Sequence, residues 1–429
     1  MRIRNVAAAS VLVLVVANPA TSAPGDLDDE FGDGGIATID LGDVVNGGFR
    51  DVVVAPDGKV VAVGYANAAD PDVLVARFLA TGAPDTSFSG DGWLTSNLGA
   101  VGSQFGTAVA VYENGSILVG AQGVGPTSGT EDFFLARFGI TGTLDPEFNG
   151  GVVITDAGAS LPFDSTDKLQ DVVLQPEGTI LVTGVTWTDD QDFVVVRYGE
   201  TGALDGSFSG DGVRFVEFEG GDDWAYAIAV QSNDKIVLAG TAVIDGTQQI
   251  GLARLRPTGS LDRAFGRSGR AWTSFTGEAH GYAMALQDDG RIVVGGDRAG
   301  GLDQDYVAAR FRPGGGLDRT FSGDGMARID IDPEGDIAFG VLVQRNGRVV
   351  LAGRAGEGTA ADAALVRLMP DGRLDEAFGQ NAVVRTDVDF YFDQLLAVVR
   401  MNGRILGAGS IGIAATGSDL PALLRYLRT

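Results

Sequence analysis

The sequence contains no cysteine, and among its 429 residues it has one histidine, His280, and three lysines. Without cysteine there can be no disulfide and no Cys–His catalytic pair, so the hydrophobic core must stabilise the fold. A Ser–His–Asp triad would have to use His280, but no G-x-S-x-G or H-E-x-x-H motif accompanies it. Beyond the first 23 residues no apolar run is long enough for a bilayer, so we expect no membrane span.

Basic residues are few as well. The 31 Lys and Arg residues stand against 57 Asp and Glu residues, which gives a net charge of −26 at pH 7. The phosphates of nucleic acids and anionic membranes would be repelled by such a chain, so we expect no nucleic-acid partner. A surface of this sign favours cations and basic partners.

The first 23 residues have the plan of a secretory signal peptide. Arg2 and Arg4 form a positive n-region, residues 6–17 are largely apolar, and residues 21–23 have the small side chains of a cleavage site. We therefore expect export to the periplasm, the cell surface or the medium. The remainder, residues 24–429, is predicted to be a single domain.

One unit recurs seven times along this remainder, with a phenylalanine, an aspartate three positions before it, and an arginine at the end of an apolar run. The phenylalanines are Phe31, Phe88, Phe148, Phe208, Phe265, Phe321 and Phe378. The aspartates are Asp28, Asp85, Asp145, Asp205, Asp262, Asp318 and Asp375. The arginines are Arg77, Arg137, Arg197, Arg254, Arg310, Arg367 and Arg425. Seven copies of each marker, in step, indicate a repeat architecture.

Each unit predicts four short strands, which residues 51–98 illustrate with the runs DVVV, KVVAVG, VLVARF and WLTSNL. The Asp-Gly or Asn-Gly pair between the first two runs predicts a two-residue type I′ hairpin turn. No segment has a sustained helical period. We therefore predict an all-β fold, a seven-bladed β-propeller with four antiparallel strands per blade.

The ends of the chain predict how the ring closes. A strand of the fourth kind at residues 36–41 comes first, and a strand of the third kind at residues 423–427 comes last. The N-terminal strand should therefore complete the last blade. A solenoid is the main alternative, but it would leave two exposed sheet edges.

The consensus of the unit runs L-D-x-x-F-G-x-x-G, then apolar-P-D-G-K-I-V-apolar-G, then D-F-x-x-A-R-F. In this pattern the chain resembles the delta-60 repeat of secreted and surface bacterial proteins, from Leu27 to its C-terminus. The resemblance implies a propeller-like β-structure. It carries no established catalytic residues, so none are transferred to this sequence.

Two recurring motifs could be either functional or structural. The FSGDG segments at residues 88–92, 208–212 and 321–325 supply one carboxylate each, and other units have Gly34, Ser268 or Asn381 in its place. A calcium loop needs several converging oxygen ligands, so we predict that FSGDG is a turn. The repeated arginine is predicted to bind the repeated aspartate, or nearby loop carbonyls, as a structural fork.

Function is predicted to lie on the face formed by the variable connections, from second to third strand and from fourth to next first strand. Its candidate ligand-binding residues are Trp187 and Trp224, as stacking platforms, and His280. Its candidate Ca²⁺ ligands are Asp330, Asp332, Glu334 and Asp336, which would share one side of an extended loop. No catalytic residue is predicted, and Ca²⁺ is the single candidate cofactor.

The combined features favour an exported, non-catalytic propeller scaffold that acts as a monomer. Its variable-loop face would bind a protein, a glycan or a cationic ligand. Two alternatives stay open at this point. One is a secreted glycosidase or lyase that uses two carboxylates, and the other is a module that binds Ca²⁺ or a glycan.

Overall fold

The computed structural model describes residues 23–42, 46–67, 70–126, 129–159, 165–187, 190–299 and 304–427. The predicted signal peptide, apart from its last residue Ala23, lies outside these residues. Among the described residues no helix has the length and apolar character that crossing a membrane requires.

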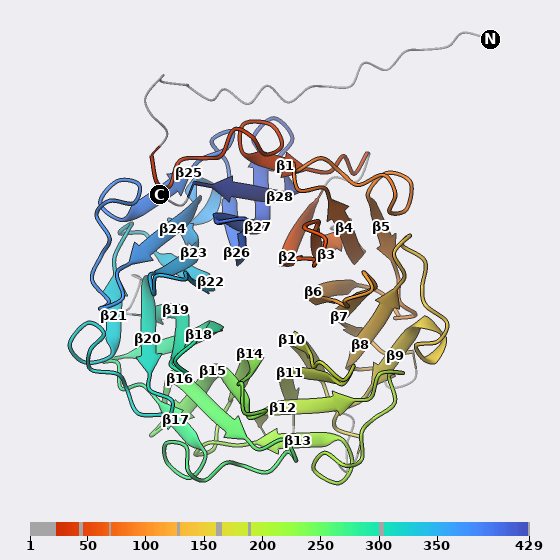
Figure 1. The fold of residues 1–429 in the computed structure, drawn as a ribbon, viewed down its shortest axis with the longest axis vertical. Helices are drawn as coiled ribbons and strands as arrows, with labels where there is room; N and C mark the ends of the chain where they lie inside the picture. Colours follow the sequence, from red (N-terminus) through yellow and green to blue (C-terminus); the bar gives the residue numbers. More distant parts are fainter. Residues whose placement is uncertain are drawn as a thin grey trace.

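The described strands form seven antiparallel sheets of four strands each, arranged as blades around a central axis (Figure 1). Two short 3-10 turns, η1 (Asn149–Gly151) and η2 (Gly358–Ala360), are the helical elements of the described chain. The strands are β1 (Ile36–Thr38); β2 (Gly47–Val54), β3 (Val60–Ala66), β4 (Asp72–Phe78) and β5 (Trp93–Ser96) of blade 1; β6 (Gln104–Val111), β7 (Ile117–Val124), β8 (Glu131–Phe138) and β9 (Val152–Thr155) of blade 2; β10 (Asp167–Leu174), β11 (Ile180–Trp187), β12 (Gln191–Tyr198) and β13 (Val213–Val216) of blade 3; β14 (Trp224–Val230), β15 (Ile236–Ile244), β16 (Thr247–Leu255) and β17 (Arg270–Trp272) of blade 4; β18 (Glu278–Leu286), β19 (Ile292–Ala299), β20 (Gln304–Phe311) and β21 (Met326–Ile329) of blade 5; β22 (Asp336–Val343), β23 (Val349–Ala355), β24 (Asp362–Leu368) and β25 (Val383–Thr386) of blade 6; and β26 (Asp393–Met401), β27 (Arg404–Ile413) and β28 (Ser418–Tyr426) of blade 7.

The ring closes as predicted. Strand β1 pairs antiparallel with β28, with Ile36 opposite Leu424 and Thr38 opposite Ala422, so the first strand of the chain is the outer strand of blade 7. The first and last strands of the chain therefore lie side by side in one sheet (Figure 1). Strand β1 ends at Thr38, three residues earlier than the predicted range of 36–41. The seven-bladed fold is confirmed.

The hairpin turns differ in part from the prediction. In blade 7, Asn402 and Gly403 both have positive φ and join Met401 to Arg404, which is the predicted two-residue turn. In blade 1 the amide of Gly58 donates to the carbonyl oxygen of Ala55, and the amide of Ala55 donates to the carbonyl oxygen of Lys59. This turn is therefore longer than the two-residue turn of blade 7. Within this turn only Gly58 has positive φ. The type I′ prediction is wrong in blade 1 and also in blades 2 to 6, where the same two backbone hydrogen bonds recur. Each of these loops has one more residue than that of blade 7, which a type I turn followed by a residue of positive φ accommodates.

Every blade contains a β-bulge in its first strand, the strand nearest the axis (Figure 1). The second strand has a glycine opposite the residue before the bulge in most blades. At Gly64, for example, a Cβ atom would lie 1.8 Å from the carbonyl oxygen of Gly48, so no larger residue fits. The bulge changes which side chain of the inner strand faces the axis.

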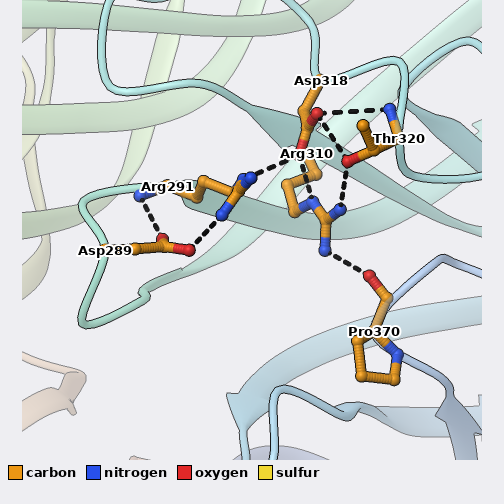
Figure 2. Close-up of polar contacts among 6 residues, drawn as sticks. All are labelled: Asp289, Arg291, Arg310, Asp318, Thr320 and Pro370. Carbon is orange, nitrogen blue, oxygen red and sulfur yellow. Dashed lines mark hydrogen bonds and ion pairs between the residues drawn. The ribbon is translucent and has the colours of Figure 1, made fainter.

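A buried knot of arginine, aspartate and phenylalanine joins neighbouring blades, and Arg310 shows its geometry (Figure 2). The Nε atom of Arg310 donates to Asp318 at 2.9 Å, and Nη2 donates to Thr320 at 3.1 Å. Its Nη1 atom donates at 2.6 Å to the carbonyl oxygen of Pro370, in the next repeat. The guanidinium also lies 4.6 Å from the ring centroid of Phe321. The predicted fork at Arg310 is confirmed.

All seven repeats contain this knot. Each repeated arginine lies 2.7–3.0 Å from a repeated aspartate. Each also lies 4.3–4.9 Å from the ring centroid of a repeated phenylalanine, and all seven rings are fully buried. In blade 7, Arg425 binds Asp28 and Phe31, which lie at the other end of the chain. The knot therefore also closes the ring.

A second cation reaches the aspartate in five repeats, which the sequence interpretation missed. It is the residue after the hairpin turn, such as Arg291, whose Nε donates to Asp318 at 2.8 Å (Figure 2). The corresponding residues elsewhere are Lys59, Lys235, Arg348 and Arg404. Burial alone would raise the pKa of Asp318, but hydrogen bonds from Thr320 and the charges of Arg310 and Arg291 outweigh it and lower the pKa.

Replacing Arg310 by alanine should lower the free energy of unfolding by about 1–3 kcal/mol, because buried acceptors on Asp318 and Pro370 lose their donor. Arg319, an exposed residue of the same connection, is the matched control and should change little when replaced. Chemical denaturation of both variants checks this. Equal losses in the two variants would contradict a structural role of the knot.

Replacing Phe31 or Phe321 by alanine should lower the free energy of unfolding by similar amounts, about 3–5 kcal/mol each. Both rings are fully buried beneath an arginine, but Phe31 reaches Arg425 across the junction of the chain ends. Thermal and urea unfolding of the two variants measures this. A much smaller loss for Phe31 would show that the closing blade opens independently of the ring.

Candidate functional site

The antiparallel strand order places the connections on two faces, as the sequence predicted. The hairpin turns and the L-D-x-x-F connections lie at one end of the strands, and the variable connections lie at the other. The FSGDG segments belong to the first face and form turns. In them Ser89, Ser209 and Ser322 have positive φ, and the side chain of Asp211 accepts the amide of Val213 at 2.9 Å.

The residue at the bulge of each inner strand differs between blades. Aromatic residues occupy it in blades 4, 5 and 6, as Tyr226, Tyr282 and Phe339. In the other blades it is Arg50, Thr107, Gln170 or Leu396. The repeats thus share a scaffold but differ at the axis, which is where a specific ligand could be recognised.

Five aromatic side chains from blades 3 to 6 form a continuous row, which we call the axial aromatic belt: Trp187, Trp224, Tyr226, Tyr282 and Phe339. Successive ring centroids along the row are 6.3, 6.0, 5.2 and 5.6 Å apart. Each ring is only partly buried. The belt therefore presents apolar ring surface toward a possible ligand.

His280 joins the belt beside Tyr282, at a centroid distance of 6.1 Å. Its Nδ1 lies 3.1 Å from the carboxylate of the fully buried Asp297, and its Nε2 lies 2.7 Å from Oε1 of Gln248. Burial would lower the pKa of His280, but the hydrogen bond and charge of Asp297 raise it. Both ring nitrogens are thus engaged, and neither is free to take a proton from a nucleophile.

Two carboxylates lie directly after the bulge in blades 1 and 3. Asp51 accepts the amides of Val52 and Val109 at 2.7 and 2.8 Å, and so ties β2 to β6 of the next blade. Asp171 accepts the amides of Val172 and Ile228 in the same way. Burial raises the pKa of Asp51 to about 6. Burial and the nearby charge of Asp51 raise the pKa of Asp171 to about 7.

The structure brings together the three predicted ligand-binding residues. Trp187 and Trp224 are neighbours in the belt, and His280 contacts the same belt through Tyr282. The sequence interpretation missed Tyr226, Tyr282 and Phe339. Their spacing of 56 and 57 residues, in step with the repeat, was the signal that could have identified them.

The four predicted calcium ligands differ in burial and in hydrogen-bond partners. Asp336 is fully buried at the start of β22 and accepts the amides of Ile331 and Asp332. The carboxylate of Asp332 accepts a hydrogen bond from Nη1 of Arg385 at 2.7 Å. Asp330 and Glu334 are exposed. The expected extended loop is wrong, because Gly335 donates to the carbonyl oxygen of Asp332 and turns the chain. Calcium binding by these four residues stays a prediction.

Asp336 belongs to a set of aspartates at the start of the inner strands, which the sequence interpretation did not identify. Their side chains accept backbone amides of the preceding connection. The set comprises Asp167, Asp223, Asp336 and Asp393. Burial raises the pKa of Asp167 and Asp336 to about 6, and that of Asp223 and Asp393 to about 7. This role is structural.

Among the described residues one group of three carboxylates has the geometry to hold a metal ion. The group is Asp132, Asp156 and Asp167, each with an oxygen within 4.8 Å of the others. Ser165 donates to both Asp156 and Asp167. Hard oxygen ligands of this kind would suit Ca²⁺ or Mg²⁺.

Comparison with known proteins supports a propeller repeat protein. The family model described as "Domain of unknown function (DUF5122) beta-propeller" matches residues 55–88, 175–208, 231–265, 287–321 and 344–378. Each match runs from a hairpin turn to the repeated phenylalanine, in blades 1, 3, 4, 5 and 6. No curated protein matches the sequence.

Several solved structures are similar in fold at 12% sequence identity. A protein of unknown function from Dyadobacter fermentans has a TM-score of 0.47, with 92% of this chain and 98% of that chain covered. Sqt1 from Chaetomium thermophilum has a TM-score of 0.46, with 91% and 97% covered. The polysaccharide lyase Uly1 has a TM-score of 0.48, with 91% and 92% covered.

The thermal stability should be greatest in mildly acidic solution. Six aspartates whose pKa values are raised to about 6 or 7, chiefly by burial, bind protons more tightly in the folded state, so stability falls as the pH rises from about 4 through about 6 to 7. They are Asp51, Asp167, Asp171, Asp223, Asp336 and Asp393. Six aspartates of the knots have lowered pKa values, so their contribution is lost below about pH 4; they are Asp28, Asp85, Asp205, Asp262, Asp318 and Asp375.

Melting temperatures measured from acidic to alkaline pH at constant ionic strength check this expectation. The double substitution Asp51→Asn with Asp171→Asn should flatten the decline between about pH 5 and pH 8, since it removes two of the six groups. A melting temperature that rises over this range would contradict the assignment.

Proposed function

We propose that this chain is an exported delta-60 repeat protein that acts by binding rather than by catalysis. Its binding site is the axial aromatic belt on the variable-loop face, and its ligand is a glycan chain or a similar ring-bearing molecule. The observation that carries the proposal is the unbroken row of ring contacts from Trp187 to Phe339, across four blades.

Aromatic side chains of this kind are the usual source of contact area in binding sites. Tyrosine and tryptophan offer a large apolar face together with a polar tip, and they lose little conformational entropy on binding. Burial and the nearby charge of Asp297 raise the pKa of Tyr226 and of Tyr282, so both hydroxyls stay protonated. The hydroxyl of Tyr282 interacts with Asp297, and that of Tyr226 can donate to a ligand. The belt therefore combines stacking surfaces with hydrogen-bond donors.

The titratable groups near the belt have structural partners. His280 is held between Asp297 and Gln248. Both oxygens of Asp51 and of Asp171 accept backbone amides that tie neighbouring inner strands. A general acid or base needs an oxygen or nitrogen directed at the substrate, and these contacts favour a binding role over catalysis.

A carboxylate-based glycosidase or lyase is the second candidate. The pair Asp51 and Asp171 favours it, because their pKa values of about 6 and 7 lie in the range of a general acid at neutral pH. This alternative predicts product formation from a glycan, which the binding proposal does not. Testing the same polysaccharides for binding and for product release therefore distinguishes the two functions.

Retardation of the protein in native gels that contain neutral or acidic polysaccharides tests the proposal. Trp224→Ala and Tyr282→Ala should each weaken binding to a retarding polysaccharide by about tenfold or more, as expected for central aromatic contacts. Trp272→Ala, on the outer strand β17 and outside the belt, is the matched control and should bind as the unmodified protein does.

Absence of retardation by every polysaccharide, or equal retardation of the belt variants, would contradict a glycan-binding belt. Release of new reducing ends or unsaturated sugars would support the enzyme instead, and Asp51→Asn with Asp171→Asn should then abolish that release.

A further inference from the structure

Arg50 occupies the bulge position in blade 1, where blades 4 to 6 have the aromatic residues of the belt. Its guanidinium lies 4.7 Å from the ring centroid of Phe105 and 5.6 Å from that of Tyr65. These two rings are themselves in edge contact, at 5.5 Å. Arg50, on the inner strand β2, thus lies in a small aromatic cradle made by Tyr65 of β3 and Phe105 of the inner strand β6.

Within the described chain, the guanidinium of Arg50 has neither an ion pair nor a hydrogen bond. Burial lowers its pKa, but a guanidinium keeps its charge at any physiological pH. The arginines of the knot offer a direct contrast, since each has a carboxylate within 3.0 Å. None of the Arg50 nitrogens is a fully buried atom without a partner, so water can reach these donors until a ligand supplies an acceptor.

The contacts with Phe105 and Tyr65 do not use these donors. A cation–π contact places the flat face of the guanidinium, or its edge, against a ring, and the remaining N–H groups stay available for a planar oxyanion. The neighbouring Asp51 cannot serve as this acceptor, because its oxygens are directed at the amides of Val52 and Val109. These contacts leave the N–H donors of Arg50, on the inner strand β2, available to a ligand.

The position of Arg50 relative to the belt defines the ligand further. In a ring of seven blades, blade 1 faces blades 4 and 5 across the axis (Figure 1). A ligand that stacks on Tyr226 or Tyr282 and crosses the axis would reach the blade that carries Arg50.

We propose that the axial site binds a ligand that carries one carboxylate, or another planar oxyanion, on a ring-bearing body, and that Arg50 recognises this anionic group. The inference rests on the proposed binding function and names the chemistry of the ligand. A single anionic group fits better than a polyanion, because Asp51, Asp171 and the overall charge of −26 would repel further negative charge.

The unliganded protein offers the first test. Replacing Arg50 by methionine keeps most of the apolar side chain and removes the unpaired charge, so the melting temperature should stay unchanged or rise. Arg310→Ala, in the knot, should lower it. A fall in Arg50→Met as large as that in Arg310→Ala would show a structural role for Arg50 and overturn the proposal.

The second test measures binding of two probes by ligand-observed NMR titration. Galacturonate and benzoate each join a ring to one carboxylate, and galactose and benzamide are their uncharged counterparts. The charged probes should bind more tightly than the uncharged ones. Arg50→Met should weaken their binding by about tenfold or more, the effect of losing charge-assisted hydrogen bonds, and Arg50→Lys should restore part of it.

Arg267→Met is the matched control, because Arg267 is an exposed arginine of the rim that stacks on Trp272 and its loss changes the net charge equally. It should leave binding of both charged probes unchanged. Equal binding of charged and uncharged probes, or equal weakening by the two methionine variants, would overturn the role of Arg50. If Tyr282→Ala lost all probe binding while Arg50→Met bound the probes as the unmodified protein does, the result would support the belt as the binding site and overturn the role of Arg50.

Discussion

The structure depends on one interaction, the buried contact between an arginine, an aspartate and a phenylalanine, repeated once per blade. The arginine is bound by the carboxylate of its own repeat, and among the described residues Arg77, Arg137, Arg197, Arg254, Arg310 and Arg425 also donate to a carbonyl of the following repeat. Each knot therefore fixes the long connection of one blade and its angle to the next blade. A guanidinium suits this task because it offers five donors in a rigid plane and a flat face for the ring.

Because every blade needs this interaction, the number of repeats, their strands and the closing strand could be predicted from the sequence. The knot needs the same three residue types in every blade, so they recur in step and identify seven units, their four strands and the closing strand. Arg310 and its partners could be assigned to a structural role for the same reason. The second cation, such as Arg291, was missed because blades 2 and 3 have Ser116 and Thr179 at its position, which interrupts the pattern.

The axial residues were harder to predict for a physical reason. A β-bulge inserts one extra residue, so the alternation of inward and outward side chains changes phase within the strand. Tyr226, Tyr282, Phe339 and Arg50 are then not distinguished in the sequence from other strand residues. Trp187 and Trp224 were identified because they stand at the ends of strands, beside the variable connections. The buried Asp336 was assigned to a metal site because its partners are backbone amides, which leave no mark in a sequence.

The closing strand has a consequence for how the protein is made. Strand β1 is synthesised first, but its partner β28 follows nearly at the end of the chain. Until β28 emerges, blade 7 cannot form, and the growing chain has two unpaired sheet edges that could associate with other chains. Contacts of such long sequence separation also form slowly. Completion of the ring should therefore be the last step in folding of the propeller, and it should take place only after β28 has been synthesised.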